Sequence, residues 1–214
     1  YTQILTYIVH SGKMLVMKVF ISILILIFSF QSLTKADDIK DFEIEGMSVG
    51  DSLLDFFDQK KILSSKVDWY DDLEKNRFLS FAFDEKNFEE YDFVDIWTKY
   101  NDKNFKIEGV AGSVYFGQQK QFKDIHDCYK KQIEIVDQIS GLFRNIKKDG
   151  PVKKKHNADK TGNSTYTDYY FLFENNHNIT VSCYDWSKKM GDEMGRYDHF
   201  AIFIRTVELD SWLE

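Results

Sequence analysis

The sequence predicts an α+β domain: an antiparallel sheet of about six strands, arranged as two three-stranded meanders, with a long amphipathic helix packed on one face. Two patterns favour this fold class. Short runs of aromatic and β-branched residues alternate with turn-forming residues, as in antiparallel strands. Residues 121–143 instead place apolar side chains three and four positions apart, which is helical spacing. With 43% hydrophobic residues among 214, the chain can bury one core and is neither disordered nor collagen-like.

The first predicted element is a helix near residues 49–60, whose apolar residues fall at i, i+4, i+7 and i+8. Ser48, followed three positions later by Asp51, is expected to cap this helix. The helix would therefore begin directly after Ser48.

Three strands are expected next, at residues 77–83, 91–99 and 105–116. An Asn- and Asp-rich turn separates the last two, so they are predicted to form a hairpin. Gly109 and Gly112 lie inside the third strand and predict a bulge or a bend there.

Residues 121–143 form the strongest helical pattern. Only Gln132 interrupts the apolar stripe, and the opposite face is rich in Lys, Asp and Glu. We expect this helix to pack on the core, although a helix that binds a partner would have the same pattern.

The segments after this helix are expected to begin with a polar loop at 145–164, followed by a hairpin of two strands at 166–173 and 179–186. A Gly-containing connection at 187–196 then leads to a final strand at 197–206, and a short helix ends the chain at Trp212 and Leu213. This order suggests two αβββ units, although the two halves share no residue-level match.

The first 36 residues have the composition of a secretory leader. They contain no Asp or Glu, and residues 19–30 are uncharged and mainly apolar. That run is shorter than the roughly 20 residues of a membrane-spanning helix and matches the roughly 7–15 of a signal-peptide core. Thr34 and Ala36 place small residues before a cleavage after Ala36. We therefore predict a single domain over 37–214, located in the periplasm or secreted.

One alternative to a cleaved leader remains, and the residues before it need a separate interpretation. An uncleaved anchor over residues 14–30 would be interrupted only by Lys18. Residues 1–13 have no initiator Met and are expected to be an upstream extension. After cleavage we expect no stable transmembrane span.

The two cysteines, Cys128 and Cys183, agree with export. An even number of cysteines in an oxidising compartment predicts one disulfide. The alternative is a pair of buried thiols that act as small hydrophobic side chains.

Residues 46–50 match the G-x-S-x-G pattern of a nucleophile elbow, with Ser48 at the nucleophile position. An α/β-hydrolase needs strands before this elbow, and a chain cleaved after Ala36 has too few residues for them. We expect Ser48 to be structural and the protein not to be an enzyme. A small extracytoplasmic serine hydrolase that uses Ser48 is the alternative.

No metal, cofactor or catalytic Cys–His pair is predicted. The histidines show no H-x-x-x-H spacing, and no C-x-x-C is present. His126 and Cys128 lie two residues apart and so would not share a helix face.

A candidate binding surface comes from strand alternation and from charge. Alternation places Tyr184 and Trp186 on one face with His199, Phe203 and Arg205, which is a composition suited to a sugar or another small molecule. The 145–164 loop adds a basic cluster, Lys153, Lys154 and Lys155, that could meet phosphate, an anionic membrane or an acidic molecule. A partly solvated outer face and a solvated loop are the alternatives. Nucleic acid is not expected, because the chain carries a net charge of −7.

Four segments resemble a family of uncharacterised exported proteins from streamlined marine bacteria: DDIKDFEIEGMSVGDSLLD at 37–55, DCYKK at 127–131, DKTGNS at 159–164 and CYDWS at 183–187. The resemblance covers the chain from Asp37 onward and implies export. The family has no assigned activity, so no catalytic residue is implied. Two of the segments contain Cys128 and Cys183.

Together these observations predict an exported, non-catalytic binding or envelope-associated protein, monomeric by default. Its expected partner is a small molecule or a component of the cell envelope.

Overall fold

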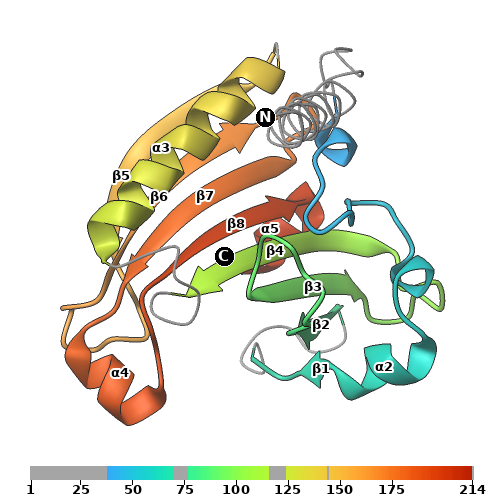
Figure 1. Cartoon of the computed structure of the whole chain (residues 1–214). Helices are drawn as coiled ribbons and strands as arrows, with labels where there is room; N and C mark the ends of the chain where they lie inside the picture. The colour runs from blue at the N-terminus through green and yellow to red at the C-terminus, as the bar shows by residue number, and fades with distance from the viewer. Residues whose placement is uncertain (1–37, 70–76, 116–123, 144, 214) are drawn as a thin grey trace, which may run out of the picture. The chain divides into compact units, whose positions relative to one another are not determined.

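The computed structural model has one eight-stranded antiparallel sheet at its centre (Figure 1). It describes residues 38–69, 77–115, 124–143 and 145–213. The strand order is β1-β2-β3-β4-β8-β7-β6-β5. The strands are β1 (Lys66–Val67), β2 (Phe78–Phe83), β3 (Phe93–Lys99), β4 (Ile107–Tyr115), β5 (Lys147–Lys155), β6 (Thr165–Leu172), β7 (Asn178–Asp185) and β8 (His199–Arg205).

The expectation of a six-stranded sheet of two three-stranded meanders, with a long helix on one face, is therefore wrong. Each half of the sheet is a four-stranded meander, and the two halves join where β4 pairs with β8. The main error concerns residues 145–164, expected to be a polar loop. They contain the edge strand β5, which pairs only with β6. The lysines of β5 are exposed. An edge strand can make its backbone hydrogen bonds to one neighbour without contributing apolar side chains to the core, so its side chains need not alternate.

The helices differ greatly in length. α3 (Ile125–Leu142) has 18 residues, whereas α2 (Gln59–Ser64), α4 (Lys188–Met194) and α5 (Val207–Leu213) have six or seven. Two 3-10 turns, η1 (Ile39–Asp41) and η2 (Leu53–Asp55), precede α2. α3 packs mainly on β7 and β8, so it covers only part of one face of the sheet.

The helix expected at residues 49–60 does not form. Instead, the backbone bonds to the first residue of β4 and to the segment before it: Gly50 N–H donates to the Ile107 carbonyl and Leu53 N–H to the Phe105 carbonyl. These tertiary hydrogen bonds replace those of a continuous helix. Caps accordingly appear at Ser52 for η2 and at Asp58 for α2, and not at Ser48.

We call the side of the sheet under α3 the α3 face. Over β7 and β8 it is covered by α3, and over β2–β4 it packs against buried side chains of residues 39–62.

The disulfide between Cys128 of α3 and Cys183 of β7 is present, with Cα atoms 6.0 Å apart, which confirms the predicted pairing. Gln132, the polar break in the apolar stripe, is buried, and its amide donates to the carbonyls of Thr167 (2.7 Å) and Val181 (2.8 Å).

We call the opposite side the α5 face, because α5 covers part of it. There Leu209 and Trp212 of α5 join a second apolar cluster with Trp97 and Ala111. Gly109 makes this approach possible, since a Cβ at this position would lie 2.3 Å from Leu209 Cδ2. The β3–β4 register shifts beside Gly109, which confirms the irregularity predicted there, whereas Gly112 pairs in regular register with Val94.

The predicted leader, residues 1–36, lies outside the described residues. Within the described part of the chain, no helix combines the length and the apolar character that crossing a membrane would require.

Candidate functional site

A row of aromatic rings crosses four adjacent strands on the α5 face. Tyr115 of β4 pairs with His199 of β8, His199 with Tyr184 of β7, and Tyr184 with Tyr166 of β6. Directly opposed residues of neighbouring strands point to the same face of a sheet. These four side chains, the aromatic row, therefore lie side by side, and Lys154 of β5 continues the row opposite Tyr166.

The rings of the aromatic row contact one another, with stacking on both sides of Tyr184 and a tilted contact between Tyr115 and His199. The Tyr184 and His199 rings are 4.4 Å apart and nearly parallel, at 10°. Tyr166 stacks on the other side of Tyr184 at 5.7 Å, and Tyr115 lies 5.1 Å from His199. All four side chains are half-buried. The row thus presents a continuous ring surface that remains partly accessible.

Two further rings extend the surface beyond the strand ends. The Trp186 and His156 rings are 4.2 Å apart, and Trp186 lies nearly parallel to Tyr184 at 6.4 Å. The Arg196 guanidinium lies 5.7 Å from the Trp186 ring centroid, within the range of a cation–π contact. Trp186 Nε1 is buried and has no hydrogen-bond partner among the described residues.

An anchor around Asp159 holds the segments that carry these two rings. Its carboxylate accepts hydrogen bonds from the hydroxyls of Thr161 (2.7 Å), Ser164 (2.6 Å) and Ser187 (2.9 Å). The Ser164 hydroxyl, followed by that of Thr161, holds the pKa of the Asp159 carboxyl well below its ordinary value. Residues 159–164, which belong to the predicted polar loop, therefore tie the loop after His156 to the start of α4.

The pKa values of both imidazoles of this surface are lowered, which favours their neutral forms. Burial lowers the pKa of His199 to about 4, and its Nδ1–H donates to the Tyr197 carbonyl (2.8 Å). Burial and the Arg196 charge lower the pKa of His156. The surface therefore consists of rings whose neutral forms are favoured, with the cations Arg196 and Lys154 at its margins and the Asp198 carboxyl bonded to the Trp186 backbone N–H (2.6 Å).

The layer next to the aromatic row is polar, buried and internally bonded. The Asp168 carboxylate accepts hydrogen bonds from Ser182 Oγ (2.7 Å) and from the Tyr170 hydroxyl (2.6 Å). Lys154 Nζ in turn donates to the Tyr170 hydroxyl (3.2 Å). These polar groups therefore use their hydrogen-bonding capacity on one another, and they form a bonded layer on one side of the rings.

The predicted surface residues divide into three groups. Tyr184, Trp186 and His199 come together in the ring surface, joined at its margin by Lys154. Lys153 and Lys155 are exposed and, by strand alternation, point to the opposite side of β5.

Phe203 and Arg205 instead belong with α5. Phe203 packs against the second apolar cluster. Arg205 donates to Thr180 Oγ1 (2.8 Å) and pairs with Asp210 of α5 (3.2 Å). These two residues therefore anchor the terminal helix.

Sequence reasoning missed Tyr115, His156, Tyr166 and Arg196. Alternation within one strand cannot show which residues of the neighbouring strands lie opposite. The assignment of β5 as a loop also hid the position of His156.

Ser48 is held by the backbone and does not cap a helix, which corrects that expectation. It is 4% exposed, and its hydroxyl donates to the carbonyls of Lys40 (2.8 Å) and Phe42 (3.0 Å). No imidazole of the described residues hydrogen-bonds to it. The described ranges also contain no cluster of three or more His, Cys, Asp or Glu that could hold a metal ion.

Comparison with protein families, with curated proteins and with solved structures found no match to this chain.

Proposed function

We propose that this protein is an exported, non-catalytic binding protein whose ligand docks on the aromatic row. The observation that carries the proposal is the unbroken row of ring contacts from Tyr115 through His199 and Tyr184 to Tyr166, which is tilted at Tyr115 and stacked from His199 to Tyr166, and which Trp186 and His156 extend. Rings on a sheet face usually pack under a helix or a loop. Here the side chains of the aromatic row stay partly exposed, because α5 packs farther along the face, on Trp97 and Ala111.

The chemistry of the surface favours a ligand with a flat, weakly polar face. Aromatic rings bind such faces by stacking and by burying C–H groups, as they do with sugar rings. The two neutral imidazoles and the tyrosine hydroxyls add hydrogen bonds without adding charge. We therefore favour a carbohydrate, free or as part of the cell envelope.

Location in an oxidising compartment fits the same proposal. A disulfide between α3 and β7 is typical of proteins of the periplasm or of the exterior. The leader predicted within residues 1–36 would deliver the chain there. If the native protein retained residues 1–36 by intact mass and were found in the cytosol with both cysteines reduced, this part of the proposal would be wrong.

Binding can be tested by NMR, by titrating neutral oligosaccharides of three to six sugars, with glucose and N-acetylglucosamine oligomers as the two series. The Trp186 indole N–H resonance, assigned with the Trp186→Phe variant, should shift in a saturable way with at least one series. Tyr184→Ala should weaken binding by about tenfold, since stacked aromatic contacts contribute about 0.5–1.5 kcal/mol beyond their buried area.

The matched control is Tyr100→Ala. Tyr100 is also partly exposed but lies at the end of β3, outside the aromatic row. If no oligosaccharide shifts the Trp186 resonance, or if Tyr184→Ala and Tyr100→Ala behave alike, the aromatic row is not a carbohydrate site. Far-UV circular dichroism of each variant confirms that the fold is retained.

A further inference from the structure

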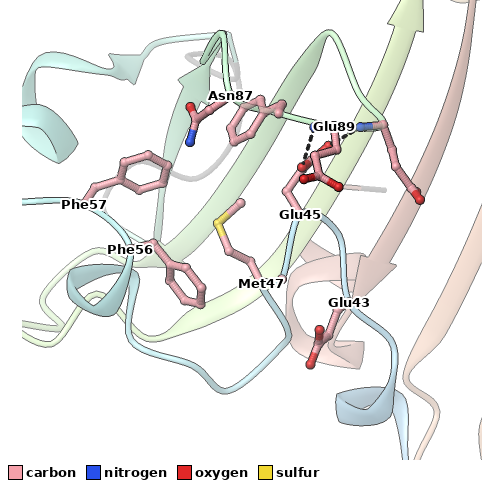
Figure 2. Close-up of a pocket in the computed structure, with 10 residues that line it drawn as sticks. Glu43, Glu45, Met47, Phe56, Phe57, Asn87 and Glu89 are labelled. Carbon is pink, nitrogen blue, oxygen red and sulfur yellow. Dashed lines mark hydrogen bonds between the residues drawn. The ribbon is translucent and has the colours of Figure 1, made fainter. Parts of the chain in front are cut away.

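A separate cavity of about 530 Å³ lies between the N-terminal segment and the connection from β2 to β3 (Figure 2). Its lining comes from three stretches of the chain, within residues 43–47, 56–57 and 87–90. This volume lies within the range of roughly 300–1,000 Å³ that is usual for sites of small molecules. The cavity shares no residue with the aromatic row, so it is independent of the proposed function.

One wall of the cavity is apolar and aromatic. It is formed by Phe56, Phe57, Phe88 and Met47. Phe57 is fixed by stacking on Phe83, with ring centroids 4.3 Å apart and an interplanar angle of 9°. Phe56 remains 39% exposed. In Figure 2, Phe56 and Phe57 lie across the cavity from Glu45 and Glu89, with the Met47 side chain between them.

The other wall is negative. Glu43, Glu45, Glu89 and Glu90 line it, and no Lys, Arg or His is among the lining residues. The Glu45 carboxylate is held by the backbone N–H groups of Glu89 (3.0 Å), Glu90 (2.8 Å) and Tyr91 (3.0 Å). It therefore fixes the connection that carries Glu89 and Glu90. Glu43, Glu89 and Glu90 have exposed side chains that a ligand can reach.

From this lining we infer that the cavity binds a small organic cation, namely a protonated amine on an apolar chain. The ammonium group would lie against the glutamates, and the carbon chain would lie against Phe56, Phe57 and Met47. Carboxylates and aromatic faces both attract ammonium groups, and the aromatic wall removes the chain from water. An inorganic cation would leave that wall unused, and an anion would be repelled by the four carboxylates.

The test is a titration of the ¹⁵N-labelled protein with hexylammonium chloride, with 1-hexanol as the uncharged analogue of the same length. The amide resonances of Glu89, Glu90 and Tyr91 report on the cavity, because these N–H groups bind the Glu45 carboxylate. Hexylammonium should shift them in a saturable way, and its affinity should fall as salt rises. Hexanol should bind at least about threefold more weakly.

Variants identify the two walls separately. Replacement of two exposed carboxylates, Glu43→Gln with Glu90→Gln, should weaken hexylammonium binding by about three- to tenfold, as expected for exposed ion pairs. Phe56→Ala should weaken it by about two- to fivefold, as expected for an exposed cation–π contact. The matched control, Glu134→Gln with Asp137→Asn on the exposed side of α3, removes the same charge elsewhere and should leave the affinity unchanged.

Four results would overturn the inference. Equal binding of hexanol would show an apolar cavity without charge selection. Equal weakening by the α3 control would show attraction to the whole protein and no defined site. Absence of saturable shifts would show no site at all. A blocked lysine amide, which carries the same ammonium group, should bind more weakly than hexylammonium; tighter binding would assign the cavity to a peptide lysine and not to a small amine. None of these results bears on carbohydrate binding at the aromatic row.

Discussion

Replacement of Gln132 tests whether its amide joins α3 to the sheet. The side chain is 2% exposed and donates to two strand carbonyls, Thr167 of β6 and Val181 of β7. A Gln132→Met variant keeps the length of the side chain but removes both donors. The variant loses two hydrogen bonds worth about 1 kcal/mol each and leaves two carbonyls with fewer partners. The expected loss of unfolding free energy from these changes is about 2–4 kcal/mol. Burial of an apolar side chain returns about 1 kcal/mol, so the expected net loss is about 1–3 kcal/mol.

A Gln132→Glu variant sharpens the test. An ionised carboxylate cannot donate to a carbonyl, and burial would raise its pKa above the usual value for Glu, near 4.3. Below about pH 4.3 the introduced carboxyl is protonated in both the folded and the unfolded state, so the variant should be most stable there. Its stability should then fall as pH rises toward the folded-state pKa.

The assay is urea unfolding of the oxidised protein, followed by far-UV circular dichroism at pH 7 and at pH 4.5. Gln138→Met is the matched control, because Gln138 is exposed on the same helix. The proposed role of Gln132 is refuted if Gln132→Met and Gln138→Met unfold within about 0.5 kcal/mol of each other, which is the usual range for surface substitutions.

Two further predictions concern the disulfide and a buried acid. The Cys128→Ala/Cys183→Ala double variant should lose about 4 kcal/mol of unfolding free energy, which is what the chain-entropy model gives for a disulfide between residues 55 positions apart. A loss below about 1 kcal/mol in urea unfolding would contradict this prediction. Burial raises the pKa of Asp95 on β3 from 3.8 to about 8. Between these two pH values the folded state holds one proton more than the unfolded state. The free energy of unfolding should therefore fall as pH rises through this window, by at most about 1.4 kcal/mol per pH unit. Asp95→Asn should flatten the pH dependence of the melting temperature between pH 5 and 8, and an unchanged slope would show that Asp95 is not the source.

Most strands could be predicted because their periodicity and turn residues are local. The predicted strands 166–173 and 179–186 differ from β6 and β7 by one residue at each end. The segments that failed depend on distant partners. β5 has no apolar alternation, since it forms an edge strand by pairing with β6. Residues 49–60 have a helical pattern, but hydrogen bonds to the segment before β4 prevent a continuous helix.

The candidate site could be predicted only where one strand or one residue carried the signal. Strand alternation placed Tyr184 and His199 on the same face, and the pairing of β7 with β8 shows that they are direct neighbours. Phe203 follows the same alternation but packs near α5, whose position no local pattern reveals. The acidic cavity was not predicted, because residues 43–47 and 87–90 are far apart in the sequence and meet only in the folded chain.

The strand order also affects how this chain folds. Six of the seven pairings in the described sheet join consecutive strands, and only the β4–β8 pairing is distant, with partners roughly 90 residues apart. Each meander can form from local contacts, whereas the central seam must wait for a large loop to close, which is the slow kind of step in β-rich folding. Until that seam closes, β4 and β8 each expose an unpaired edge, so neither meander is a finished unit without the other.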